Sequence, residues 1–269
     1  MTRIVTFFGQ VGRVSRSLLV EIGRLSHLMQ ESLYWAFVAP VAGRKGLRRE
    51  AFARQLIFIG NESLLIVALV SASVGAVLAL QAAYQLKQFG AIIYTGGLVA
   101  VSMARELGPV VTAIVIAGRV GASITAELGT MKVQEEIDAL VTMGIPPVPF
   151  LVVPRLLAIG IMLPCLTILG DLIGMVGGYL IGTVGLGIPS SLYIEKSFDS
   201  LVSKDILTGV AKSFFFAELI GSIAIYQGLA VEAGAEGVGR ATTQSVVYSI
   251  IAIIVADCLF TAIFYYLFP

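Results

Sequence analysis

Residues 56–84 read LIFIGNESLLIVALVSASVGAVLALQAAY, an apolar stretch that carries a single charged residue, Glu62. A helix of roughly 20 apolar residues crosses the hydrocarbon of a bilayer, which is about 30 Å thick. Similar runs lie near residues 97–118, 150–183, 206–230 and 243–268. The sequence therefore predicts an all-α membrane protein with five transmembrane helices.

The composition supports a membrane environment. Hydrophobic residues make up 57% of the chain and charged residues 13%, whereas soluble domains have roughly 45–50% and about 25%. A transmembrane β-barrel is excluded because its strands would alternate over segments of about 10 residues. The net charge of +1 gives no reason to expect a nucleic-acid partner.

The distribution of charge predicts the orientation of the chain. Half of the basic residues fall within residues 1–54, before the first span. Basic residues next to a first span mark the cytoplasmic side of the membrane. We therefore expect a cytoplasmic N-terminus and, with five spans, a C-terminus on the opposite side.

Residues 1–54 form the first of two predicted regions, and the transmembrane domain, residues 55–269, is the second. From Ile4 to Leu33, apolar residues recur at the spacing of three and four that is typical of an amphipathic helix. Such a helix can lie in the headgroup layer. The alternative is a helix packed against another subunit.

Between spans two and three the sequence predicts a short helix over residues 130–143. Thr130 can cap its first turn, and Gly144 suits a left-handed position at its end. Pro146 and Pro147 then prevent continuation. One face is apolar and the other acidic, so the helix either docks on a partner or lies on the surface of its own protein; the residues concerned are Val133, Glu135, Glu136, Ile137, Asp138, Leu140 and Val141.

Several charged residues fall inside the predicted spans. A charge at the centre of a membrane helix costs roughly 2.5–3.5 kcal/mol on insertion scales. Each one therefore indicates either a function or an internal ion pair that fixes helix register. Pro109 should in addition kink span two, as in helices that line a cavity. The interior charges are Arg105, Glu106, Asp171, Lys212, Glu218 and Asp257, and those nearer the span ends are Glu62, Arg119 and Arg155.

Two other features of the spans point to packing rather than chemistry. Span three carries glycines at positions 170, 174, 178 and 182, a spacing that places them on one helix face for close helix approach. Cys165 and Cys258 fall inside spans without metal-ligand spacing, so we expect small buried hydrophobic residues there.

The chain offers little for catalysis. His27 is the only histidine and precedes the first span. The sequence contains no GxSxG elbow and no GxxxxGK[ST] phosphate-binding loop. We therefore expect no catalytic residue, no metal site and no cofactor, and any ATP that drives the protein must bind to another chain.

The motifs ARELGPV (residues 104–110), AGRVGA (117–122) and AELGTM (126–131) closely resemble those of the MlaE/YrbE family, the permeases of ABC-type phospholipid transporters. The resemblance continues through residues 135–144 and resumes at GRATT (239–243) and at Ala256-Asp257. It covers essentially all of the chain after residue 50.

The resemblance implies an assembly in the bacterial inner membrane. Its expected components are a homodimer of the permease, a cytoplasmic ATPase subunit, a periplasmic lipid-binding protein with an MCE domain and a small cytoplasmic accessory subunit. The family moves phospholipid between the inner membrane and the periplasmic carriers, and thereby maintains the lipid asymmetry of the outer membrane.

The resemblance also assigns residues. The family's ATPase-coupling helix corresponds to residues 130–143, with Glu135, Ile137, Asp138 and Leu140 as contact residues. Its lipid cavity, at the dimer interface, corresponds to Leu86, Phe89, Glu106 and Lys212. Some relatives carry tyrosine where this chain has Phe89, so a hydrogen bond from that hydroxyl is absent.

Rival functions remain open from the residues alone. In an ion-coupled secondary transporter, Glu106, Asp171 and Asp257 could carry protons without an ATPase. A structural scaffold would explain the glycine face but not the charges in the spans. An intramembrane enzyme lacks catalytic groups.

Overall fold

The apolar runs form long helices. The computed structural model describes residues 23, 30–31, 34–35, 49–232 and 234–267. Within these residues it contains five helical segments that are long and apolar enough to cross a membrane, as predicted. Each segment is longer than the apolar run from which it was predicted. The five segments are Arg49–Gln88, Ile92–Val133, Val148–Gly185, Ser203–Leu229 and Gly234–Tyr266.

The first, fourth and fifth spans are single helices, α3 (Arg49–Gln88), α10 (Ser203–Leu229) and α11 (Gly234–Leu267). Span two is composite and consists of η2 (Ile92–Tyr94), α4 (Thr95–Ser102), η3 (Met103–Leu107), α5 (Gly108–Ile116), η4 (Ala117–Gly121) and α6 (Ala122–Val133). Span three consists of η5 (Val148–Val152), α8 (Val153–Leu180) and η6 (Ile181–Gly185). Two short helices connect spans, α7 (Glu136–Thr142) and α9 (Ser190–Ser200).

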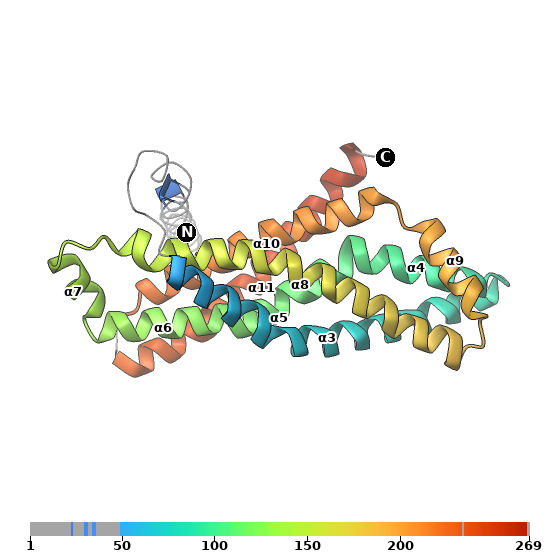
Figure 1. The fold of residues 1–269 in the computed structure, drawn as a ribbon, viewed down its shortest axis with the longest axis horizontal. Coiled ribbons are helices and arrows are strands. Elements are labelled where there is room, and N and C mark those ends of the chain that lie inside the picture. Colours follow the sequence, from blue (N-terminus) through green and yellow to red (C-terminus); the bar gives the residue numbers. More distant parts are fainter. Residues whose placement is uncertain (1–22, 24–29, 32–33, 36–48, 233, 268–269) are drawn as a thin grey trace, which may run out of the picture.

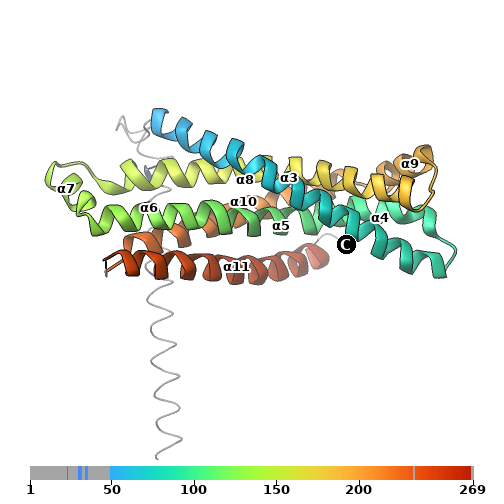
Figure 2. The ribbon, with the colours of Figure 1, turned by 90° about the horizontal axis from the view of Figure 1, so that it is seen from below.

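The spans run side by side, and the two connecting helices lie at opposite ends of the molecule (Figure 1). The second view shows the same arrangement, with α7 at one end and α9 beside the start of span two at the other (Figure 2). Since a membrane lies between the ends of its spans, α7 and α9 belong to opposite sides of the bilayer.

Helices α3 and α8 pack most extensively, through small residues. A Cβ atom on Gly75 would lie 1.8 Å from the carbonyl oxygen of Gly174, and one on Gly177 would lie 2.2 Å from that of Ala72. Backbones approach this closely only where side chains are absent. Of the predicted glycine face, Gly170, Gly174 and Gly178 pack against α3, whereas Gly182 packs against Tyr193 of α9, so its packing role is confirmed.

Large apolar side chains fill the centre of the bundle. They come mainly from span two, α8 and α10, and they pack into one contiguous cluster. The fully buried members include Ile116, Ile124, Leu128, Ile159, Leu163, Leu166, Phe216, Ile220 and Ile225.

The region around Pro109 is π-helical rather than simply kinked. Residues Met103–Leu107 form a π-helical turn, η3, and Pro109 stands in the first turn of the α-helix that follows. Proline has no N–H to donate, and a π-turn changes the register of the hydrogen bonds before it. Arg105 and Glu106 are thereby placed on an irregular turn in the middle of span two.

The connecting helix is shorter than the predicted range of residues 130–143. Helix α6 continues through Val133, and the Thr130 hydroxyl donates a hydrogen bond to the Ala126 carbonyl inside it, 2.8 Å away. Thr130 is therefore not the cap of a new helix, and that prediction is wrong. The break comes at Glu135, whose left-handed backbone (φ 60°) precedes α7.

Two further expectations have different outcomes. Most of the N-terminal amphipathic segment lies outside the described residues, although Arg49–Arg54 belong to α3.

Cys165 and Cys258 are exposed on the surface of the single chain, so the prediction that they are buried is wrong. A small apolar residue on the lipid-facing side of a span fits the hydropathy pattern equally well.

The Gly75 contact yields a stability prediction. Gly75→Ala should lower the free energy of unfolding by about 1–3 kcal/mol, because its methyl group would overlap backbone atoms of α8. Gly118→Ala is the control, since a Cβ atom there meets nothing within 4 Å. Thermal unfolding of the two purified variants in detergent measures the difference, and equal stability would show that α3 and α8 are free to separate.

Candidate functional site

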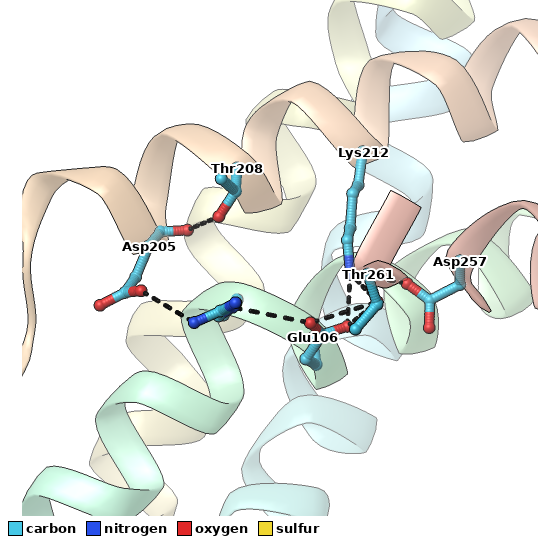
Figure 3. A network of polar contacts seen from close by, with 7 residues as sticks. Glu106, Asp205, Thr208, Lys212, Asp257 and Thr261 are labelled. Carbon is cyan, nitrogen blue, oxygen red and sulfur yellow. Dashed lines mark hydrogen bonds and ion pairs between the residues drawn. The ribbon is translucent and has the colours of Figure 1, made fainter. Parts of the chain in front are cut away.

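A buried ion network joins three spans in the middle of the bundle. Lys212 of α10, of which 1% of the side chain is exposed, points its ammonium group at Glu106 on η3. The same ammonium group donates to Asp257 Oδ1 at 2.9 Å and to Thr261 Oγ1 at 2.8 Å, both on α11. Figure 3 shows these four side chains converging.

Helix periodicity explains the convergence. Asp257 and Thr261 are four residues apart, so they lie one turn apart on the same face of α11. The Thr261 hydroxyl also lies 3.1 Å from Glu106 Oε2. All three donor positions of the lysine ammonium are thus matched by oxygen atoms.

Arg105 extends the network toward the surface. Its Nε lies 3.8 Å from Glu106 Oε1, and its Nη1 lies 3.9 Å from Asp205 Oδ1. Asp205 in turn accepts a hydrogen bond from the Val202 N–H at the start of α10, at 3.2 Å. The ion pairs of Arg105 are long and 36% of its side chain is exposed, so its guanidinium can bind an additional anion.

The network pairs its buried cation with anions, as the low dielectric constant of a membrane interior requires. An unpaired charge inside a membrane is unfavourable, and Lys212 is compensated by two carboxylates. Glu106, with 31% of its side chain exposed, and Asp257, with 24%, also reach the surface of the single chain. The site therefore presents a partly exposed acid, held in place by a buried lysine, next to a partly exposed guanidinium.

Apolar grooves run along α3. One groove, of about 260 Å³, is lined by residues of α3 and by Leu107, the neighbour of Glu106. A second, of about 610 Å³, extends to Leu86 and Leu98. Leu78 and Gln81 line both grooves, so together they form a continuous path along α3 from Leu107 to Leu86.

The four residues assigned to a lipid cavity therefore separate into two pairs. Glu106 and Lys212 meet directly. Leu86 lines the second groove, and Phe89 follows the end of α3 with 79% of its surface exposed. No hydrogen bond or ion pair links one pair to the other among the described residues, and the grooves reach only Leu107, the neighbour of Glu106 in the sequence.

Of the other charges in the spans, Arg119 and Arg155 form ion pairs, whereas none is observed for Asp171 or Glu218 among the described residues. Arg119 pairs with Glu62 at 2.6 Å, and the buried Arg155 pairs with Glu127 at 2.7 Å. Asp171 is buried, and its Oδ1 has no hydrogen-bond partner within the described residues. Glu218 lies on α10 with its carboxylate near Gly160 of α8.

Helix α7 is held at both ends. The Gly144 N–H donates to the Val141 carbonyl and the Ile145 N–H donates to the Leu140 carbonyl, which is a Schellman motif around the left-handed Gly144. The predicted C-terminal end is thus confirmed. Lys132 at the end of α6 forms an ion pair with Asp138 at 3.2 Å, which ties α7 to span two.

The contact residues predicted on this helix face different ways. Ile137 is buried in the core of its own chain, and Leu140 packs against that core. Glu135 and Asp138 are exposed, as are the apolar Val141 and Met143. The outer surface of α7 is therefore acidic with an apolar edge.

Sequence reasoning missed four residues of these networks. Thr261 could have been found from its spacing of four from Asp257. Leu78 and Gln81 belong to a helix that looks uniformly lipid-facing in sequence. Asp205 lies near the end of its span, and only its distance to Arg105 reveals the pairing.

Several known proteins are similar to this chain over most of its length. A family profile described as "Permease MlaE" matches residues 52–263. A probable ABC transporter permease protein of Rickettsia conorii is 40% identical over 263 residues, which is 98% of this chain and 95% of the relative. The intermembrane phospholipid transport system permease protein MlaE of Haemophilus influenzae is 35% identical over 265 residues, covering 97% and 98%.

The ion network yields a stability prediction with a rescue. Lys212→Met should cost about 3–5 kcal/mol of stability, because it leaves two carboxylates without their buried cation. Adding Glu106→Gln and Asp257→Asn should recover most of that loss, since no charge then remains uncompensated there.

Thermal unfolding in detergent measures these changes, with Lys87→Met at the exposed end of α3 as the control. If the triple variant is no more stable than Lys212→Met alone, the ion pairing does not account for the stability of this region.

Proposed function

Because this chain belongs to the MlaE permease family, we propose that it moves phospholipid between the inner membrane and periplasmic carriers with an MCE domain, and so maintains outer-membrane lipid asymmetry. The chain is a multi-pass membrane protein and the permease subunit of an ABC transporter. Its family implies an ATPase and a substrate-binding partner. The name of the Haemophilus influenzae relative supports phospholipid as the cargo.

The observation that carries this proposal is the path along α3. A phospholipid has apolar chains and a charged headgroup, and the path offers apolar grooves that end at Leu107, the neighbour of Glu106 in the sequence. Acyl chains occupy the grooves near Leu86, and Phe89 stands at their outer mouth. A headgroup phosphate binds to Arg105, whose guanidinium is exposed and only weakly engaged.

Lys212 has a supporting role in this proposal. It is too deeply buried to meet a headgroup in the observed arrangement. It holds Glu106 at the end of the path, where the carboxylate can accept a hydrogen bond from the amine of a zwitterionic headgroup. Asp257 and Thr261 complete the support from α11.

A second copy of the chain completes the cavity. The grooves on α3 lie on the surface of a single chain, and their α3 walls include exposed apolar side chains such as Leu80 and Tyr84. A homodimer in which α3 faces its counterpart encloses a lipid between two such surfaces. The small accessory subunit on the cytoplasmic side is a further component of the proposed assembly.

Helix α7 couples the permease to the ATPase. Its Schellman motif, its ion pair with Lys132 and its buried Ile137 make it a rigid unit of the bundle. Force applied to its outer surface is therefore transmitted into span two, which carries η3 and the ion network. The exposed Val141 and Met143, with the acids Glu135 and Asp138, form the docking surface.

The proposed orientation places α7 in the cytoplasm and α9 in the periplasm, following the basic bias of residues 1–54. Cysteines introduced at the exposed positions Ser190 and Thr142 report on it, in a chain with Cys165 and Cys258 replaced by alanine. An impermeant reagent added to the periplasmic side should label the first and not the second. The opposite pattern would reverse the topology.

An ion-coupled secondary transporter is the second candidate. Glu106 and Asp257 are tied to Lys212, so Asp171, which is buried and has an unpaired oxygen, is the acid best suited to carry an ion. This alternative requires transport by the permease without any ATPase.

The lipid path can be tested at both ends. Glu106→Gln should leave folded yield and ATPase association intact, because Lys212 remains paired with Asp257. It should lower lipid transfer by roughly 10- to 150-fold through loss of a charge-assisted hydrogen bond of about 1.5–3 kcal/mol. Transfer of fluorescent phospholipid to the purified carrier measures this.

A photo-crosslinking residue at Leu86 should capture the same lipid during transport, whereas one at Ile57, exposed on α3 outside the grooves, should capture much less. Normal transfer by Glu106→Gln combined with a low folded yield would assign Glu106 a purely structural role.

The coupling surface is best probed at exposed residues. Changing both Val141 and Met143 to Asp should leave the permease folded in the membrane and abolish co-purification of the ATPase, since an apolar contact is replaced by two charges. Ala230→Asp, at an exposed site at the same end of the bundle, is the control. Undiminished recovery of the ATPase with the double variant would refute docking through α7.

A further inference from the structure

A third apolar groove lies between α8 and α9 and shares no lining residue with the two grooves on α3. Its volume is about 310 Å³, and its walls are almost entirely apolar. The side chains that define it are Leu172, Met175, Val176 and Tyr179 on α8 with Ile194 and Phe198 on α9.

Helix α9 is fixed from its inner side. A Cβ atom on Gly96 would lie 2.7 Å from the Tyr193 carbonyl oxygen, and one on Gly97 would lie 2.9 Å from that of Lys196, so α4 and α9 pack backbone to backbone. The buried Tyr193 ring meets Tyr179 edge to face, with centroids 5.7 Å apart. The groove remains open on the outer side, where Ile194 and Phe198 project beside α8.

The position of the groove determines whether it opens to lipid or to water. Its α8 wall includes Leu172 and Val176, which are exposed on a membrane span, so the groove is continuous with the lipid-facing surface of span three. The other side of α9 is polar, with Lys196 3.1 Å from Asp199 and 3.5 Å from Glu195. An amphipathic helix of this kind lies in the interfacial layer of a bilayer.

The chemistry of the walls selects the occupant. These side chains offer water almost no hydrogen-bond partner, so the groove favours an apolar occupant over water. A transmembrane helix of a partner would need small residues for close approach, but these walls carry leucine, methionine, valine and aromatic side chains. A flexible acyl chain can follow such a surface.

We infer that the groove between α8 and α9 holds one acyl chain of a bilayer phospholipid as a resident ligand, outside the transport path. The acyl chain fills the space between α8 and α9 and so holds α9 against span two. Because α4 leads directly into η3, this lipid supports the segment that carries Arg105 and Glu106. The inference does not depend on which substrate is transported.

Photo-crosslinking in native membranes tests this site. A benzoylphenylalanine at position 198 is compared with one at Val184, which is also exposed near the end of span three but does not line the groove. Cells are grown with radioactive phosphate, and the full-length permease is irradiated after extraction and washing in detergent. We expect about tenfold more labelled phospholipid at position 198, which corresponds to a preference of about 1.4 kcal/mol over bulk lipid.

A substitution that fills the groove provides the second part of this test. Val176→Trp should remove the capture at position 198 by occupying the groove, whereas Leu180→Trp, on the same helix outside the groove, should not. Equal capture at positions 198 and 184, or capture unaffected by Val176→Trp, would overturn the inference. Capture of a protein instead of phospholipid at position 198 would also overturn it, because the groove would then be a subunit contact.

Discussion

The cost of placing the Lys212 ammonium group in the membrane interior organises the rest of the structure. A buried cation must be met by oxygen atoms on every side, and no single helix can supply them. They come from η3, where Glu106 lies, and from one face of α11, where Asp257 and Thr261 lie. Spans two, four and five are thereby fixed in register by one side chain.

The π-helical turn η3 is the complement of this constraint. It sits directly before Pro109, and it carries Glu106 toward the lysine and Arg105 toward Asp205. The same span reaches α7 at one end through Lys132 and α9 at the other through Gly96 and Gly97. Span two thus joins the ion network to α9 through backbone packing and to α7 through an ion pair.

The glycine contacts between α3 and α8 have a different role. They bring two backbones together without large side chains, and so the outer face of α3 keeps its apolar residues for the grooves. In the proposed function, helix packing and lipid binding therefore use different residues of the same helix. This division explains how a nearly uniform apolar sequence can serve both.

Much of this could be predicted from the sequence, because hydropathy acts locally. The length of each apolar run predicted five spans, and the glycine spacing predicted the packing face of α8. Gly144 and the prolines after it predicted where α7 ends. The charges within the spans identified the candidate site, since any charge there needs a compensating partner. The motifs around residues 104–131 pointed to the family.

The tertiary structure alone decided which charges meet. Lys212 and Asp257 are 45 residues apart, and Glu106 is 106 residues from Lys212, so no local pattern could pair them. It also decided that Ile137 faces inward, that α6 runs past Thr130, and that Leu78 and Gln81 join two grooves, because these depend on how neighbouring helices pack. Periodicity along one helix shows which residues share a face; what that face contacts is determined by the other helices.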